Sequence, residues 1–180
     1  MSIYVAMLRG INVGGQRIVK MESLRASFEA WGFSRVRTYV QSGNVIFEVQ
    51  KTSSKDLPKI ITAKISKDFG FSILVILRTS DEIRKIVGGN PFLDEKAVDH
   101  SKLHITFLSA LPAKDATERI DALNARPDQF HVGGREIYLY CPNGYGRTKL
   151  SNTALEKALS VGATTRNWKT ASTLARISSE

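Results

Sequence analysis

The sequence predicts an α+β protein made of two ferredoxin-like βαββαβ subdomains with antiparallel sheets, followed by a C-terminal helix. Apolar residues alternate between strand-like and helix-like spacing in this same order twice along the 180 residues. Each half also contains a glycine-bearing turn between its second and third strands. Split βαβ units of this kind form a four-stranded antiparallel sheet with helices on one face.

The first half should contain a strand, a helix, two strands, a helix and a strand. Their expected residues are Ile3–Leu8, Met21–Trp31, Val36–Val40, Asn44–Val49, Leu57–Ile65 and Ser72–Leu77. The last strand is apolar throughout Ile73–Leu77, which predicts burial on both faces. A capping-box pattern at Thr79–Glu82 then opens a short helix, and Gly88–Pro91 ends it.

The polar residues 91–102 are the expected connector between the two subdomains, residues 1–90 and 103–180. The second subdomain repeats the order of elements. Its expected strands and helices are Leu103–Leu108, Ala116–Leu123, Gln129–Val132, Glu136–Tyr140, Thr153–Val161, Ala163–Arg166 and Trp168–Ile177. We expect Thr153–Glu156 to cap the helix that ends before Gly162. The repeat lies in element order, with no matching residues evident between the halves.

The chain is basic, with 26 Lys and Arg against 17 Asp and Glu, which gives a net charge of 26 − 17 = +9. A basic protein of this size attracts phosphorylated ligands or polyanions such as nucleic acid. Solubility alone is the other explanation for this charge. The cations are scattered rather than gathered in a run, so the sequence does not indicate a basic tail.

Topology predicts a first cluster of functional candidates, because the loop after the first strand and the turn between the second and third strands share one end of a sheet. The residues are Arg9, Asn12, Gly14, Gly15, Gln41, Ser42 and Asn44. Glycines let backbone amides approach an anion. The pattern lacks the Gly-Lys-Ser/Thr ending of a P-loop, and its glycine spacing differs from that of a dinucleotide-binding motif. A tight turn with a solvated or salt-bridged Arg9 is the alternative.

A second cluster should form where the third and fourth strands of the second half end. Its residues are Arg147, Lys149, Arg166, Asn167, Trp168 and Lys169. These cations lie near the starts of two helices, where an anion is favoured. Trp168 is a candidate for stacking on a base or sugar. In the alternative reading, Trp168 anchors the terminal helix in the core, and the charges are solvated.

Other kinds of chemistry are disfavoured by the sequence. His100 and His104 lack a third ligand at a spacing suited to zinc, so we expect no metal site and no cofactor. The single cysteine, Cys141, is expected in the core rather than as a nucleophile. No stretch approaches the ~20 apolar residues of a membrane helix, and Ile3–Leu8 reads as a strand rather than a signal peptide. We therefore expect a cytoplasmic protein without a membrane partner.

Four sequence blocks resemble an uncharacterised bacterial family, domain of unknown function 1697. They are LRGINVGG at Leu8–Gly15, RTYVQSGNVIF at Arg37–Phe47, PNGYGRTKL at Pro142–Leu150 and ATTRNW at Ala163–Trp168. The resemblance covers essentially the whole chain and implies an α+β fold with two ferredoxin-like subdomains. It implies no catalytic role, but its blocks coincide with the two clusters.

Three functional hypotheses follow. The first is a binding module for a phosphorylated or other anionic ligand, with nucleic acid as one candidate. The second is an enzyme for a small anionic substrate, in which Ser42 or Tyr145 takes part in proton transfer. Its charge-holding residues would be Arg9, Arg147, Lys149 and Arg166. The third is a protein-interaction scaffold, which an exposed apolar patch would favour.

Overall fold

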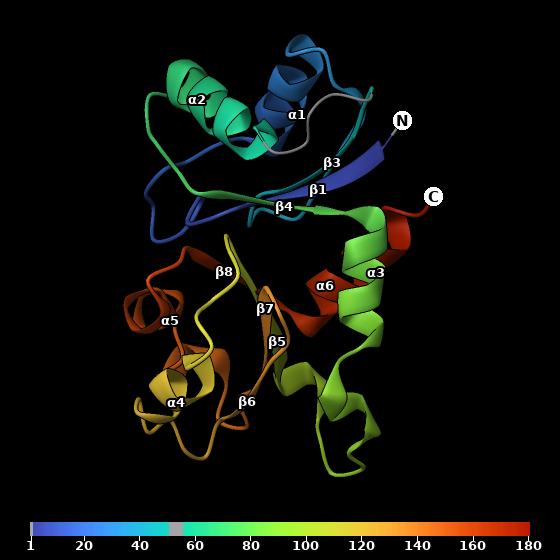
Figure 1. The fold of residues 1–180 in the computed structure, drawn as a ribbon. Helices are drawn as coiled ribbons and strands as arrows, with labels where there is room; N and C mark the ends of the chain where they lie inside the picture. Colours follow the sequence, from blue (N-terminus) through green and yellow to red (C-terminus); the bar gives the residue numbers. More distant parts are fainter. Residues whose placement is uncertain (1, 51–55) are drawn as a thin grey trace. The chain divides into compact units, whose positions relative to one another are not determined.

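The computed structural model describes residues 2–50 and 56–180 and shows an α+β fold with two four-stranded antiparallel sheets (Figure 1). The chain divides into two compact units. The first unit is Met1–Ile83 with Leu174–Glu180, and the second is Arg84–Thr173. The predicted fold class is therefore confirmed.

The first unit has the strand order β2-β3-β1-β4, the ferredoxin-like arrangement. Its elements are β1 (Ser2–Leu8), α1 (Met21–Ala30), β2 (Ser34–Tyr39), β3 (Asn44–Val49), α2 (Leu57–Phe69), β4 (Val75–Thr79) and the start of α3 (Ser80–Gly88). Helices α1 and α2 cover one face of the sheet (Figure 1). Phe28 of α1 contacts Phe47 of β3 with ring centroids 5.3 Å apart, and both rings are fully buried.

Strand β4 begins at Val75, three residues later than expected, and extends through Arg78 and Thr79. The shift follows from pairing, since Val75 is the residue opposite Leu8, the last residue of β1. Thr79 then forms the predicted capping box. Its Oγ1 accepts from the Glu82 amide at 3.2 Å, and the Glu82 carboxylate accepts from the Thr79 amide at 2.7 Å.

The second unit repeats this arrangement with the strand order β6-β7-β5-β8. Its elements are the end of α3, η1 (Pro91–Asp94), η2 (His100–Lys102), β5 (Leu103–Leu108), α4 (Ala116–Asp121), β6 (Gln129–Val132), β7 (Glu136–Tyr140), η3 (Tyr145–Arg147), α5 (Asn152–Leu159), β8 (Ala163–Asn167) and most of α6 (Trp168–Ile177). Helices α4 and α5 lie on one face of the sheet (Figure 1). Ile120, Leu155 and Leu139 join the two layers in a buried core.

The prediction that Thr153–Glu156 caps α5 is wrong. The cap is Ser151, whose extended backbone directs its Oγ to accept from the Ala154 amide at 3.3 Å. Thr153 lies inside the helix. The Glu156 carboxylate instead accepts from the Ala163 amide at 3.0 Å and so holds the start of β8.

The expectation that no residues match between the halves also needs correction. Arg78 lies opposite Val5, three residues before the end of β1, and Arg166 lies opposite Ile105, three residues before the end of β5. Each arginine is followed by the residue that caps the next helix. The matching positions are too few to be seen by comparing the two halves of the sequence directly. They can be recognised only when the residues of β4 and β8 are compared by their partners on β1 and β5.

In each sheet, a segment from outside the βαββαβ core contacts the face opposite the two core helices. In the first unit, Arg37 of β2 donates to the Ile177 carbonyl near the end of α6. In the second unit, Phe92 of η1 packs on Tyr140 of β7, with ring centroids 6.0 Å apart. Across the described residues, no helix has the length and apolar character needed to cross a membrane.

Candidate functional site

The first predicted cluster does come together at one end of the first sheet. The Leu8 amide donates to the Gly43 carbonyl at 2.8 Å, which joins the end of β1 to the β2–β3 turn. Asn12 then links the loop after β1 to the same turn. Its Nδ2 donates to the Gln41 carbonyl at 2.8 Å and to the Val19 carbonyl at 3.0 Å, and its Oδ1 accepts from the Val19 amide at 2.8 Å. Asn12 is thus a positioning residue.

The glycines of this loop are explained by a tight turn. Gly14 and Gly15 have φ values of +61° and +74°, and the Gln16 amide donates to the Val13 carbonyl at 3.1 Å. Two positive φ values inside such a turn define type I′, the turn of two-residue hairpins. The geometry therefore supports the tight-turn alternative over a phosphate-binding loop.

The remaining members of this cluster lie at the same end of the sheet. The backbone amide of Arg9 donates to the Leu74 carbonyl at 2.9 Å, and the arginine side chain is half-buried. Asn44 is buried and donates to the Tyr39 carbonyl at 3.0 Å and to Ser42 Oγ at 3.1 Å. Gln41 and Ser42 are exposed. Ligand binding by these residues stays a prediction.

The strand ends that carry the second predicted cluster are paired around the start of β5. Leu103 lies opposite Tyr140 at the end of β7, and His104 lies opposite Asn167 at the end of β8. The ring of Tyr145, in the loop after β7, stacks on His104 with centroids 4.8 Å apart. Burial lowers the pKa of His104 from its ordinary value of 6.5, and a contact with the Lys102 carbonyl opposes that shift.

Two of the residues nominated here, Arg166 and Asn167, have structural partners. Arg166 is 6% exposed, and its Nη1 donates to Thr164 Oγ1 and to the Thr165 carbonyl, both at 2.9 Å. Burial lowers the pKa of Arg166 to about 10, against an opposing effect of Tyr145. Asn167 caps α6 by accepting from the Thr170 amide at 2.8 Å.

The other four residues of the second cluster lie in different surroundings. Trp168 is half-buried, with its ring 6.3 Å from that of His100, while Arg147 and Lys169 are exposed. The Nζ of Lys149 donates to the Asn124 carbonyl at 3.2 Å. The cations of this cluster therefore do not form one compact site.

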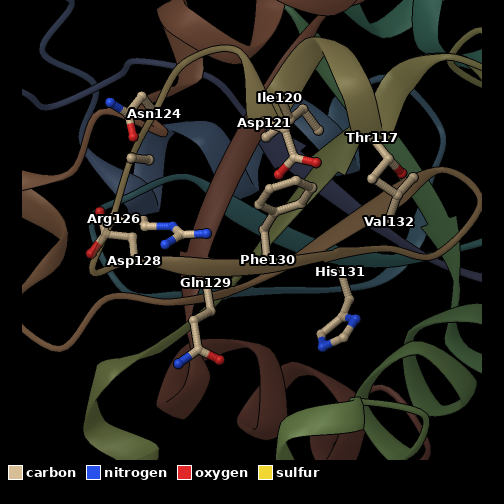
Figure 2. Close-up of a pocket in the computed structure, with 11 residues that line it drawn as sticks. Thr117, Ile120, Asp121, Asn124, Arg126, Asp128, Gln129, Phe130, His131 and Val132 are labelled. Atoms are coloured by element: carbon tan, nitrogen blue, oxygen red, sulfur yellow. The ribbon is translucent and has the colours of Figure 1, made fainter.

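Asn124 belongs to the wall of a pocket that the sequence did not indicate. This pocket has a volume of about 690 Å³ and lies between α4 and β6 (Figure 2). Pockets of this size commonly hold small ligands. Its wall is formed by Thr117, Ile120, Asp121, Asn124, Ala125, Arg126, Asp128, Gln129, Phe130, His131 and Val132.

Two exposed side chains of opposite charge, Arg126 and Asp121, lie on this wall together with the apolar ring of Phe130. Among the residues that the structure describes, neither the Arg126 guanidinium nor the Asp121 carboxylate makes a hydrogen bond or an ion pair. In Figure 2 the Arg126 side chain extends toward Phe130, whereas Gln129 and His131 point to the opposite side of the strand. An anionic group entering the pocket would find Arg126 available.

The second predicted cluster adjoins this pocket through one end of its loop. Thr148 donates to the Asp128 carboxylate at 2.6 Å, so Asp128 already has a donor. Lys149 reaches the pocket wall at Asn124, as described above. The pocket surroundings thus combine two cations, Arg126 and Lys149, with two carboxylates, Asp121 and Asp128.

Sequence reasoning missed Arg126 because nothing local distinguishes it from other surface arginines. It lies in a short link between a six-residue helix and a four-residue edge strand. The available signal was topological, since the second strand of a βαββαβ unit lies at a sheet edge, where its start and the preceding helix can enclose a groove.

The structure does not assemble the residues named for the enzyme hypothesis in one unit. Arg9 and Ser42 belong to the first unit, while Tyr145, Arg147, Lys149 and Arg166 belong to the second. Over residues 2–50 and 56–180, no three His, Cys, Asp or Glu side chains gather as metal ligands would. Cys141 is buried, and burial raises the pKa of its thiol to about 11.

Comparisons with known proteins identify a family and a fold. The profile of the family described as "Protein of unknown function (DUF1697)" matches residues 1–138. The chain is also similar to the solved structure of the conserved bacterial protein SP0830 from Streptococcus pneumoniae. That likeness has a TM-score of 0.74 at 19% identity and covers 98% of each chain, and it concerns the fold alone. No curated protein matches the sequence.

Proposed function

The chain belongs to the DUF1697 family of proteins of unknown function, and within that family we propose that it is a binding module for a small anionic ligand held between α4 and β6. The observation that carries this proposal is the Arg126 side chain. It lies on the wall of a pocket of about 690 Å³ and makes no hydrogen bond or ion pair with any described residue. A guanidinium in such a place can pair bidentately with a carboxylate or phosphate.

The charges around the pocket favour a ligand with a single negative group. Lys149 adds a second positive charge at the wall, but Asp121 and Asp128 add two negative ones. A polyanion entering here would meet both carboxylates, whereas a ligand with one carboxylate needs only the guanidinium of Arg126 as its partner. A monocarboxylate therefore fits this pocket better than a nucleic acid backbone does.

Binding is tested by following backbone amide NMR signals during titrations at low salt. The probes are N-acetylvaline, inorganic phosphate and a twelve-nucleotide single-stranded DNA. We expect N-acetylvaline to shift the signals of residues 117–132, and Arg126→Gln to abolish those shifts. A salt series separates the DNA response, because contacts with several phosphates weaken steeply with salt.

A matched control is available on α4, the helix that borders the pocket. Arg119 of α4 lies outside the pocket wall and pairs with Asp115 at 2.8 Å. Arg119→Gln removes the same charge as Arg126→Gln, so both variants have the same net charge. Equal responses of the two variants to N-acetylvaline, or an unaltered response in Arg126→Gln, would contradict the proposal.

A further inference from the structure

The pocket includes the open edge of a sheet. Strand β6 is the outermost strand in the order β6-β7-β5-β8 and pairs with β7 on one side. All four of its residues, Gln129–Val132, belong to the pocket wall. The Gln129 and His131 side chains point to the other side of the strand, so the backbone of β6 borders the groove together with Phe130. An open edge of this kind is a template for another extended segment.

The register shows which backbone groups of β6 are available. The Gly133 amide donates to the Glu136 carbonyl at 2.9 Å and closes the β6–β7 hairpin. Hydrogen-bonded and non-bonded pairs alternate along an antiparallel ladder. Because Gly133 bonds to β7, the backbone groups of every second residue before it, His131 and Gln129, also face β7. Phe130 and Val132 therefore direct their amides and carbonyls toward the open edge.

Arg126 lies just before the start of β6, and this position sets a direction for an added strand. A strand that pairs antiparallel with β6 has its C-terminal end next to the N-terminal end of β6. Its terminal carboxylate would then lie beside the unpaired guanidinium of Arg126. The Asp121 carboxylate on the α4 side is complementary to a donor or basic group of the same segment.

We propose that this groove takes the C-terminal end of an extended peptide, which adds to β6 as an antiparallel strand and pairs its terminal carboxylate with Arg126. Backbone hydrogen bonds to Phe130 and Val132 would supply affinity, as in other cases of strand addition. The inference rests on the proposed function and names the ligand class of the same site.

The test begins with an array of random six-residue peptides that have free C-terminal carboxylates, probed with the full chain. The tightest binder is then synthesised as the free acid and as the C-terminal amide. Two further free-acid forms each carry one backbone N-methyl group, at adjacent residues. Titration calorimetry should show at least tenfold weaker binding of the amide. One N-methylated form, but not the other, should lose binding, since alternate amides of an added strand face β6.

Protein variants separate the two levels of the proposal. Arg126→Gln should reduce binding of the acid to the level of the amide, while Arg119→Gln should not. Equal binding of the two N-methylated forms, or an array without any binder, would overturn strand addition. The anion-binding proposal would survive either result if Arg126→Gln still abolished the N-acetylvaline response. Loss of that dependence on Arg126 would overturn both.

Discussion

Arg78 and Arg166 hold the same position in the last strands of the two sheets and make the same hydrogen bond. In each case Nη1 donates at 2.9 Å to the carbonyl of the preceding residue, Leu77 or Thr165. Both side chains are buried, with exposures of 2% and 6%. The buried arginine followed by a helix cap is thus a local unit that occurs in both sheets.

Shortening either arginine should destabilise the fold through lost packing. We expect Arg166→Ala to lower the free energy of unfolding by roughly 2–4 kcal/mol, in the range of large buried truncations. Arg166→Met should cost less, because it keeps the volume and removes the buried charge. Urea denaturation should show the same ranking for Arg78. Equal losses for Ala and Met would contradict a packing role.

Two glycines with similar backbones should respond differently to alanine. Gly15 has φ +74° and open space around the position of an added Cβ, whereas at Gly43, with φ +82°, that Cβ would lie 2.6 Å from Ile11 Cδ1. Gly15→Ala therefore incurs backbone strain of about 1 kcal/mol. Gly43→Ala adds a steric clash and should lower the urea midpoint further. A larger effect at Gly15 would contradict this packing.

Asn12 should matter for both its hydrogen bonds and its backbone. Its φ is +55°, and its side chain makes the three hydrogen bonds to Val19 and Gln41 described above. Asn12→Ala should lower the free energy of unfolding by about 2–3 kcal/mol. Asn12→Gly should cost less, because glycine accepts the positive φ. Neither change should alter binding at Arg126, which NMR titration with N-acetylvaline would check.

His104 should make stability fall on the acid side. Its pKa in the folded chain is below 6.5, so the unfolded chain binds more protons between the two values. The contribution of neutral His104 to the free energy of unfolding is complete above about pH 6.5. It is lost progressively as the pH falls toward the lowered pKa. His104→Phe keeps an aromatic ring against Tyr145 and should flatten this dependence in urea denaturation between pH 5 and 7.5. His100→Phe, at an exposed position, is the control; a slope unchanged in His104→Phe would contradict the account.

Much of the fold could be predicted because its signals are local. The periodicity of Leu24 and Phe28 and the Thr79–Glu82 capping box depend on neighbours in sequence, and both are seen in the structure. The convergence of Asn12 with Gln41 followed from the order of strands alone. The cap of α5 was misplaced because Ser151 and Thr153 are both good capping residues, and the backbone at Ser151 decides between them.

The pocket was beyond prediction because it depends on tertiary placement. The importance of Arg126 comes from its position at the start of an edge strand and from the absence of partners among the described residues. Lys149 was nominated with Arg166, yet its side chain reaches Asn124 instead. Which of two neighbouring loops a lysine contacts depends on packing that no local pattern encodes.

The most direct test of the account is to map the binding of a free-acid peptide selected from the array onto the backbone amide NMR spectrum. Shifts confined to α4 and residues 124–132, and absent in Arg126→Gln, are the predicted result. Shifts centred on residues 9–20 or on residues 145–147 and 166–169, with the α4–β6 groove unaffected, would contradict it.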